Sequence, residues 1–341
     1  MPHAIAHRPP ATRAGLAALC GALFSRALSS GALFFAAASL LGCASDRHPA
    51  GPTDSARAAA TPSAAVRGSA CDGESPLPLG LSERHVTSGG IDRRFLVYLP
   101  GGYDRRSPLP LVLNFHGSGG TPEGQLETSQ LNALADAERF AIALPASVGP
   151  RWNVPPDAAK PDDVRFTADT LDALGALLCI DPARVFATGF SGGARLSSQL
   201  ACDLSPRIAA IAAIGGVRFP GPCSAARSMP ILAFHGTGDT TNPYAGGGES
   251  YWGTGVESAI DGWGQHNGCG PRRERPVAPS VVQLAYGGGS CADVVLYRID
   301  GFAHSWPGAI YPDREDGTAN DLLWAFFESH PLPATLPPPA R

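Results

Sequence analysis

The chain has 341 residues, of which 44% are apolar, enough to build a sizeable hydrophobic core. Its 26 basic and 30 acidic residues give a net charge of −4, which excludes a strongly cationic protein. No basic run interleaved with aromatic residues occurs, so nucleic acid is not expected to be a partner. Neither an internal repeat nor a second regime of composition is present, so the sequence predicts a single folded domain over residues 71–331.

Residues 1–43 are expected to be a signal peptide and not part of the fold. They carry three arginines and no acidic residue, and their apolar run over 31–42 is short for a membrane span. The run ends in Leu40-Leu41-Gly42-Cys43, which resembles a bacterial lipobox whose cysteine is lipidated. Leu41 is unusual at its position, so ordinary secretion with cleavage nearby is the alternative. Both readings predict export to the extracellular space or the cell envelope, with membrane anchoring only through a lipid on Cys43.

Two segments beside the domain are expected to lack regular structure. Residues 44–70 are rich in Ala, Pro, Ser, Thr and Gly without periodicity, which is typical of a flexible linker. Residues 332–341 form a proline-rich tail. The mature protein is therefore predicted to consist of a linker, one domain and a short tail.

Six cysteines remain after the predicted signal peptide, an even number in a chain that is expected to enter an oxidising compartment. Three disulfides are therefore predicted, although six cysteines allow fifteen pairings and free thiols are the alternative. Nearness in sequence pairs Cys202 with Cys223 and Cys269 with Cys291, and elimination then pairs Cys71 with Cys179. No Cys-x-x-Cys or His/Cys cluster is present, so no metal site is expected.

Apolar runs alternate with helical periodicity from about residue 71 onward, which predicts a mostly parallel α/β sheet flanked by helices. The expected strands cover 94–99, 109–115, 141–144, 185–188, 208–214, 229–235 and 294–299. The expected helices cover 125–139, a segment capped at Asp162-Asp163 that carries Leu171, Leu174 and Leu178, 194–202, 256–263 and 322–327.

The stretch Gly189-Phe190-Ser191-Gly192-Gly193 fits the pattern G-x-S-x-G between a predicted strand and a predicted helix. Glycines let the backbone turn sharply and lift the serine hydroxyl clear of the sheet. The helix that follows points free N–H groups at any oxyanion formed on Ser191. The pattern is weak by itself, because a plain Gly/Ser turn satisfies it too, so a base, an acid and a second oxyanion donor must be found elsewhere.

Chain order selects the acid and the base. In an α/β-hydrolase the order is serine, acid, histidine, each on a loop after a strand. Asp239 is the first acid after Ser191 that directly follows an apolar strand, and His304 lies just after the last predicted strand. Asp300 is the rival acid. The other later histidines are less well placed, since they lie in or at the end of predicted helices: His266 and His330.

The second oxyanion donor is expected in the loop His116-Gly-Ser-Gly-Gly120, which follows the strand that ends at Phe115. Small residues let backbone N–H groups approach a substrate closely, and we assign the donors to Ser118 and Gly192. His116 is interpreted as organising this loop. A phosphate-binding loop is disfavoured, because the lysine of a P-loop and the dinucleotide fingerprint are both missing.

These segments together resemble the secreted feruloyl esterase and polyhydroxybutyrate depolymerase group of α/β-hydrolases. The resemblance covers nearly the whole chain after residue 85, with motifs in the same order. The matching segments are Phe-His-Gly-Ser-Gly-Gly (115–120), Trp152, Asp162-Asp163-Val164 with Phe166, Gly-Phe-Ser-Gly-Gly (189–193), Leu-Ala-Cys (200–202), His-Gly-Thr-x-Asp (235–239) with Pro243-Tyr244, and Gly-x-x-His-x-Trp-Pro-Gly (301–308).

The resemblance implies a serine esterase without metal or organic cofactor, in which Ser191, Asp239 and His304 form the triad. It also implies that Trp306 lines the acyl site, and Trp152 is a further candidate for contact with an aromatic acyl group. Two departures matter. Ser118 stands where many depolymerase relatives carry a cysteine, and no polymer-binding module follows the domain, which disfavours attack on solid polyester.

The expected substrate is therefore a feruloyl or related hydroxycinnamoyl ester of plant polysaccharides. Soluble hydroxybutyrate oligomers and acetyl-xylan are the alternatives within the same chemistry. A peptidase or a cell-wall acyltransferase would use the same triad. A non-catalytic binding lipoprotein is the alternative from a different class, which the presence of all three triad residue types disfavours.

Overall fold

The computed structural model describes residues 71–73, 75–288, 291–311 and 317–334. All of them belong to one compact unit, Pro62–Arg341. The predicted signal peptide, Cys43, the linker 44–70 and most of the proline-rich tail lie outside the described residues.

Within the described residues, ten strands form a single sheet in the order β1-β2-β4-β3-β5-β6-β7-β10-β9-β8. The pairs from β4 to β10 are parallel, and the pairs at both edges are antiparallel, so the prediction of a mostly parallel α/β sheet is confirmed. The strands are β1 Gly80–Ser88, β2 Ile91–Leu99, β3 Leu109–Phe115, β4 Ala141–Pro145, β5 Ile180–Phe190, β6 Ile211–Ile214, β7 Ile231–Gly236, β8 Arg273–Ala278, β9 Val281–Tyr286 and β10 Val294–Ile299.

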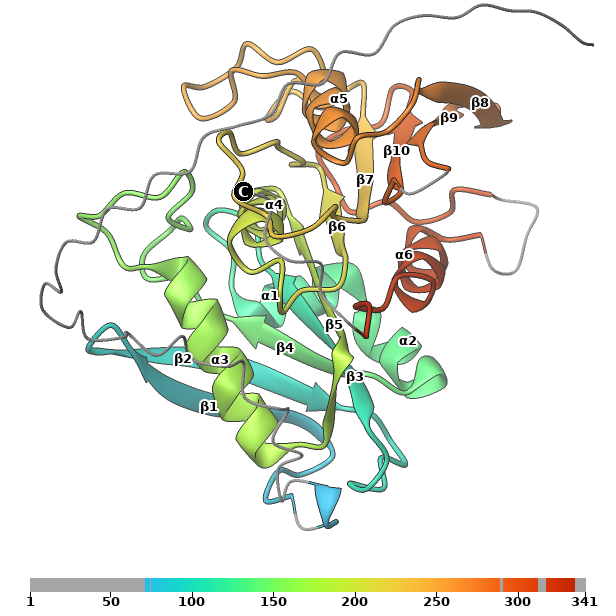
Figure 1. Ribbon diagram of the computed structural model, residues 1–341. Helices are drawn as coiled ribbons and strands as arrows, with labels where there is room; N and C mark the ends of the chain where they lie inside the picture. The colour runs from blue at the N-terminus through green and yellow to red at the C-terminus, as the bar shows by residue number, and fades with distance from the viewer. Residues whose placement is uncertain (1–70, 74, 289–290, 312–316, 335–341) are drawn as a thin grey trace, which may run out of the picture. The chain divides into compact units, whose positions relative to one another are not determined.

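Helices cover both faces of this sheet, which is why the central strands are apolar on both sides (Figure 1). One buried cluster joins the sheet to α3, α4 and α5, and a second joins the opposite face to α2 and α6, with α1 beside it. Alternation along β3 divides its residues between the two clusters, with Leu111 and Leu113 in the first and Val112 in the second. The helices are α1 Pro122–Ser129, α2 Leu131–Glu138, α3 Asp163–Leu177, α4 Gly192–Asp203, α5 Val256–His266 and α6 Ala319–Glu328.

Two features differ from the sequence prediction, and one expected detail is confirmed. The single helix expected over 125–139 is two helices, because Gln130 adopts a left-handed conformation with φ 52°. The edge strands β1, β8 and β9 were not predicted; β1 and β8 carry exposed polar residues that hide an apolar alternation, whereas β9 is mostly apolar and short. The expected helix cap at Asp162 is confirmed, because its carboxylate accepts a hydrogen bond from Arg165 N at 2.9 Å.

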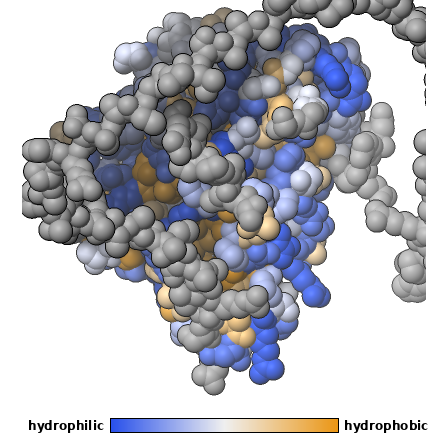
Figure 2. Space-filling view, viewed as in Figure 1, coloured by the Kyte–Doolittle hydropathy of each residue, from blue (hydrophilic) through white to orange (hydrophobic). Residues whose placement is uncertain are grey.

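The six predicted disulfide cysteines are paired as expected: Cys71 with Cys179, Cys202 with Cys223, and Cys269 with Cys291. Cys202 lies in α4, and its bridge ties the segment that follows β6 to this helix. On the face shown in Figure 2, hydrophilic residues dominate and apolar residues form smaller patches between them. None of the helices in the described part of the chain is long and apolar enough to cross a membrane.

Candidate active site

Ser191 occupies the sharp turn between β5 and α4. Its backbone has φ 52° and ψ −108°, a conformation that is costly for a residue with a Cβ. Hydrogen bonds hold the turn on both sides: Ser191 N donates to Ile214 O at 2.8 Å, and Arg195 N donates to Ser191 O at 3.1 Å. The strand-turn-helix context that the G-x-S-x-G pattern requires is therefore present.

Glycine at two positions of this turn is a requirement of packing. A Cβ on Gly193 would lie 2.1 Å from Phe115 O, and a Cβ on Gly189 would lie 2.6 Å from Gly193 C. The start of α4 therefore packs directly against the end of β3. This close approach brings the loop after β3 next to Ser191, as the predicted oxyanion hole demands.

Asp239 and His304 meet although 65 residues separate them in the chain. Asp239 follows β7 and His304 follows β10, and these two strands are parallel neighbours in the sheet. His304 Nδ1 lies 2.6 Å from Asp239 Oδ2. The rival acid Asp300 is exposed and instead accepts a hydrogen bond from Arg298 at 3.0 Å. The structure thus pairs the predicted base with the predicted acid.

Hydrogen bonds keep the Asp239 carboxylate ionised. Burial alone would raise the pKa of Asp239, but hydrogen bonds from His235, Asn242 N and His304 lower it to about 2. An ionised carboxylate accepts hydrogen bonds only, so Nδ1 of His304 carries the proton that it donates to Asp239. In the neutral imidazole this leaves Nε2 as the acceptor, which is the state that a general base needs.

His304 lies beside the turn that carries Ser191. The ring of Phe190, the residue before Ser191, lies 4.7 Å from the His304 ring centroid to centroid. Gly215 directly follows Ile214, the last residue of β6, whose oxygen accepts the hydrogen bond from Ser191 N. Gly215 also lies close to His304, since a Cβ on it would lie 3.5 Å from His304 Nδ1. Asp239 and His304 are hydrogen-bonded to each other, and Ser191 lies on the adjacent turn. Within the described residues, Ser191 Oγ makes no hydrogen bond to His304. Such bonds are commonly long before substrate binds.

The two predicted oxyanion donors lie next to each other. A Cβ on Gly192 would lie 3.1 Å from Ser118 N and 2.7 Å from Ser118 Oγ. In the same loop Gly119 N donates to Pro150 O at 2.7 Å and Gly120 N donates to Gly117 O at 3.0 Å. Within the described part of the chain, neither Ser118 N nor Gly192 N donates to another group. These two N–H groups are therefore available to one external acceptor.

Trp152 requires a correction. It was a further candidate for contact with an aromatic acyl group, but only 5% of the residue is exposed, and its indole N–H donates to His116 O at 2.8 Å. Its ring packs edge-on against Phe115 at 5.4 Å. Trp152 is therefore a packing residue that supports the loop after β3, because burial leaves almost none of its surface open to a ligand.

His116 has the organising role that we expected. Its Nδ1 lies 2.8 Å from Gly117 O, and its Nε2 accepts a hydrogen bond from Ser147 N at 3.2 Å. Burial lowers the pKa of His116, which keeps the ring neutral and suits an Nε2 that accepts. The neutral ring thus connects the loop after β3 to the loop after β4.

Trp306 lies two residues beyond His304 and is half-buried. Its indole N–H donates to Asn320 Oδ1 at 2.9 Å, and Asn320 Nδ2 donates to Ser129 O at 2.8 Å. Helix α6 and the end of α1 therefore fix the position of this ring. The two histidines that we set aside have other partners: His266 contacts the rings of Phe219 and Trp263, and His330 contacts Phe326.

His235 is a residue of the site whose role sequence reasoning missed. It is buried at the end of β7, and its Nε2 lies 2.9 Å from Asn242 O and 3.3 Å from Asp239 Oδ2. His235 therefore holds both the Asp239 carboxylate and the turn behind it. Its place in the motif His-Gly-Thr-x-Asp was the available signal. No group of three or more His, Cys, Asp or Glu side chains among the described residues is arranged to hold a metal ion.

Comparison with known proteins gives the class. No protein-family model matches the chain. Feruloyl esterase B of Piromyces equi is 32% identical over 193 residues, a match that covers 52% of this chain and 36% of that protein. Feruloyl esterase D of Neurospora crassa is 27% identical over 253 residues, covering 70% of this chain and 82% of that protein. The solved acetyl xylan esterase from Aspergillus awamori has a TM-score of 0.53 at 16% identity, covering 66% of this chain and 94% of that one.

The chain has the α/β-hydrolase fold, and the relatives that it is similar to are carboxylic-ester hydrolases. Within this class the curated relatives include several feruloyl esterases at 25–32% identity, which confirms that part of the resemblance drawn from the motifs. The match spans about a third of the length of the Piromyces protein, so the substrate of this chain must be argued from its own site.

Proposed function

We propose that the protein is a serine esterase in which Ser191 is the nucleophile, His304 the general base and Asp239 the orienting acid. The hydrogen bond of 2.6 Å between His304 Nδ1 and Asp239 Oδ2, next to the strained turn at Ser191, carries this proposal. A carboxylate and an imidazole that are only packing partners would not need a serine held at φ 52° on the adjacent turn. A fluorophosphonate probe that labels active serines would separate this function from a non-catalytic binding lipoprotein.

The reaction would be acyl transfer in two halves. Ser191 Oγ attacks the ester carbonyl while His304 Nε2 takes its proton, and Asp239 stabilises the imidazolium that forms. The N–H groups of Ser118 and Gly192 stabilise the tetrahedral oxyanion, each contributing about 3 kcal/mol by analogy with other oxyanion donors. His304 then protonates the leaving alcohol, and water repeats the sequence on the acyl-enzyme.

The proposed substrate class is hydroxycinnamoyl esters of plant polysaccharides. Feruloyl esterases among the relatives support this choice, and so does Trp306, whose half-buried ring is fixed two residues from His304. An aromatic acyl group stacked on such a ring gains about 1 kcal/mol beyond its buried area. Acetyl-xylan is the second candidate, because a bifunctional acetylxylan esterase/xylanase of Neocallimastix patriciarum is 30% identical over 157 residues.

Export belongs to the same proposal. The three disulfides suit an oxidising compartment, and the sequence of residues 1–43 fits a signal peptide that ends at Cys43. Extracellular or cell-envelope location would place the enzyme where polysaccharide esters occur. Lipid attachment at Cys43 is testable by mass spectrometry of the mature N-terminus.

A panel of esters tests the substrate choice. We expect a higher kcat/KM for methyl ferulate than for a soluble hydroxybutyrate oligomer or an acetylated xylo-oligosaccharide. Replacement Trp306→Ala should lower kcat/KM for the aromatic ester more than for the acetyl ester. Faster turnover of the oligomer, with Trp306→Ala lowering both rates equally, would reassign the enzyme to polyester oligomers.

A further inference from the structure

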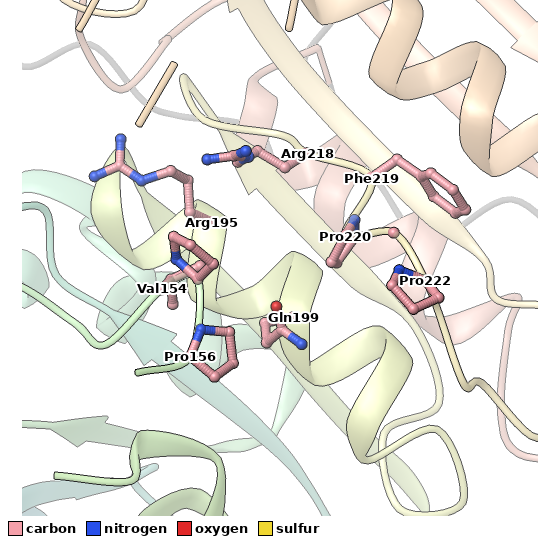
Figure 3. Close-up of a pocket in the computed structure, with 10 residues that line it drawn as sticks. Val154, Pro156, Arg195, Gln199, Arg218, Phe219, Pro220 and Pro222 are labelled. Carbon is pink, nitrogen blue, oxygen red and sulfur yellow. The ribbon is translucent and has the colours of Figure 1, made fainter. Parts of the chain in front are cut away.

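A pocket of about 270 Å³ opens along α4, the helix that follows the proposed catalytic serine. Arg195 and Arg218 lie at one end of it, and the side chain of Arg218 extends toward that of Arg195 (Figure 3). The walls come from the loop after β4, from α4 and from the segment after β6. Its lining residues are Val154, Pro155, Pro156, Arg195, Gln199, Arg218, Phe219, Pro220, Gly221 and Pro222.

The cationic end of the pocket reaches the proposed oxyanion hole. Arg195 lies one turn of α4 beyond Ser191, and its Nη2 lies 3.4 Å from Ser118 Oγ. A Cβ on Gly192 would lie 3.5 Å from the same Nη2. One short ester can therefore place its carbonyl at Ser191 and a second group, a few bonds away, at the two guanidinium groups.

These arginines lack the acidic partners that balance charge elsewhere. Within the described residues, no carboxylate lies within 4.0 Å of a guanidinium nitrogen of Arg151, Arg195 or Arg218. All three instead gather around Tyr251. Arg195 lies 4.4 Å and Arg151 5.6 Å above its ring, and Arg218 donates to its backbone oxygen. A cation over an aromatic ring is stabilised far less than a cation beside a carboxylate.

Other buried arginines of the same chain show what compensation looks like. Arg93, which is 2% exposed, lies 2.7 Å from the carboxylate of Asp163. Arg227 donates to four backbone oxygens, those of Ser205, Ile208, Ala209 and Ser228. Arg195 is nearly as buried, at 6% exposed, yet its acceptors within the described residues are the Ser118 hydroxyl, at 3.4 Å, and the Tyr251 side chain, and neither is a carboxylate.

Burial and the neighbouring cations make the charge on Arg195 costly. Burial lowers the pKa of Arg195 to about 10; the phenol of Tyr251 opposes this shift, and the charges of Arg218 and Arg151 add to it. Arg195 is nevertheless cationic at neutral pH. Arg195 is buried and Arg218 is half-buried, so two like charges without a carboxylate partner make the pocket favourable for an anion.

From this arrangement we propose that Arg195 and Arg218 bind a carboxylate on the ester substrate, so that the enzyme prefers anionic esters over neutral ones. The proposal rests on the proposed esterase function, because it assigns the substrate of the same site. Two guanidinium forks match the planar geometry of a carboxylate. The apolar walls from Val154, Phe219 and the prolines suit the carbon skeleton that carries it.

Matched esters that differ in one charge test the proposal. Methyl 4-carboxycinnamate and methyl 4-carbamoylcinnamate place the difference on the acyl side, and 3-acetoxybenzoate and 3-acetoxybenzamide place it on the alcohol side. We expect the carboxylate to raise kcat/KM roughly tenfold to a hundredfold in at least one pair, as charge-assisted hydrogen bonds allow. Arg218→Gln should abolish this preference, because it should lower kcat/KM for the carboxylate member far more than for the neutral member.

Arg273→Gln is the matched control, because it removes one positive charge from the exposed edge strand β8. It should leave the preference intact. Inorganic phosphate serves as a free-anion probe. Equal rates within both ester pairs would overturn the proposal, and so would phosphate that binds through Arg218 while the esters show no preference.

Binding separates this proposal from the esterase function. In the Ser191→Ala variant, calorimetry should show tighter binding of the carboxylate ester than of its amide partner, and a second change, Arg218→Gln, should remove the difference. Charge-selective binding without hydrolysis by the wild type would leave the anion site standing and sink the esterase function. Hydrolysis of neutral esters without charge selectivity would support the esterase function and overturn the anion site.

Discussion

The two polar clusters nearest Ser191 are built in opposite ways. In the first, Asp239 is surrounded by donors, with His304, His235 and Asn242 N all directed at one carboxylate. In the second, Arg195 and Arg218 lie near each other without a carboxylate partner among the described residues. The first cluster is complete by itself, so it can hold a base in one tautomer before substrate arrives. The second is incomplete, so it is suited to receive a charge from outside.

The largest expected effect comes from replacing the proposed nucleophile, Ser191. Ser191→Ala should lower ester hydrolysis roughly a millionfold, because no other nucleophile is positioned at the turn. Circular dichroism and thermal melting should show an intact fold. Residual activity above about a tenth of the wild-type rate would reject Ser191 as the nucleophile.

The next effect breaks the complete cluster. Asp239→Asn should lower kcat by about ten thousandfold, because an amide cannot hold the protonated Nδ1 of His304 in the same way. Asp300→Asn is the matched control, and it should cost about tenfold or less, since Asp300 is exposed and paired with Arg298. The measurement is kcat of both folded variants under steady-state conditions. A larger loss of kcat in Asp300→Asn than in Asp239→Asn would contradict the assignment of the acid.

Two disulfides allow the role of the arginine cluster to be tested separately from overall stability. Cys202–Cys223 closes the segment that carries Arg218, whereas Cys269–Cys291 lies elsewhere with nearly the same loop length, 22 residues against 21. Replacing either pair by serine should cost about 3 kcal/mol of unfolding free energy, measured by denaturant titration. Only Cys202→Ser/Cys223→Ser should also weaken the preference for the anionic ester. Equal loss of preference in both variants would mean that the pocket does not depend on its own bridge.

The smallest effect is the dependence of stability on pH. The pKa of Asp239 falls from 3.8 to about 2 on folding, so its carboxylate stabilises the folded state above pH 4 and loses this contribution as pH falls toward 2. Comparison with Asp239→Asn, which cannot titrate, should show a difference in unfolding free energy that shrinks by about 2 kcal/mol over that interval. Parallel pH profiles for the two proteins would contradict the hydrogen-bonded carboxylate.

The sequence predicted the complete cluster much better than the incomplete one. Asp239 and His304 follow apolar strands whose alternation with helices determines their order in the sheet, so chain order alone selected them. Arg195, Arg218 and Tyr251 come from a helix and two irregular segments. No periodicity relates such segments, so their meeting is visible only in three dimensions.

The same distinction explains the differences in the fold. The central strands have mostly apolar, buried segments and were recognised by them, whereas β8 reads Arg-Glu-Arg-Pro-Val-Ala and offers almost no apolar face. The break at Gln130 has no Gly or Pro to mark it. Trp152 was placed near the substrate by its motif, but its burial depends on the loops after β3 and β4, whose packing the sequence does not reveal.

Covalent labelling tests the central claim most directly. The wild-type protein, treated with a fluorophosphonate and digested, should yield a single phosphonylated peptide that contains Ser191, and Asp239→Asn should slow its formation by orders of magnitude. The same treatment of Ser191→Ala should yield no adduct. An unlabelled wild-type protein, or an adduct on a serine other than Ser191, would contradict the esterase site described above.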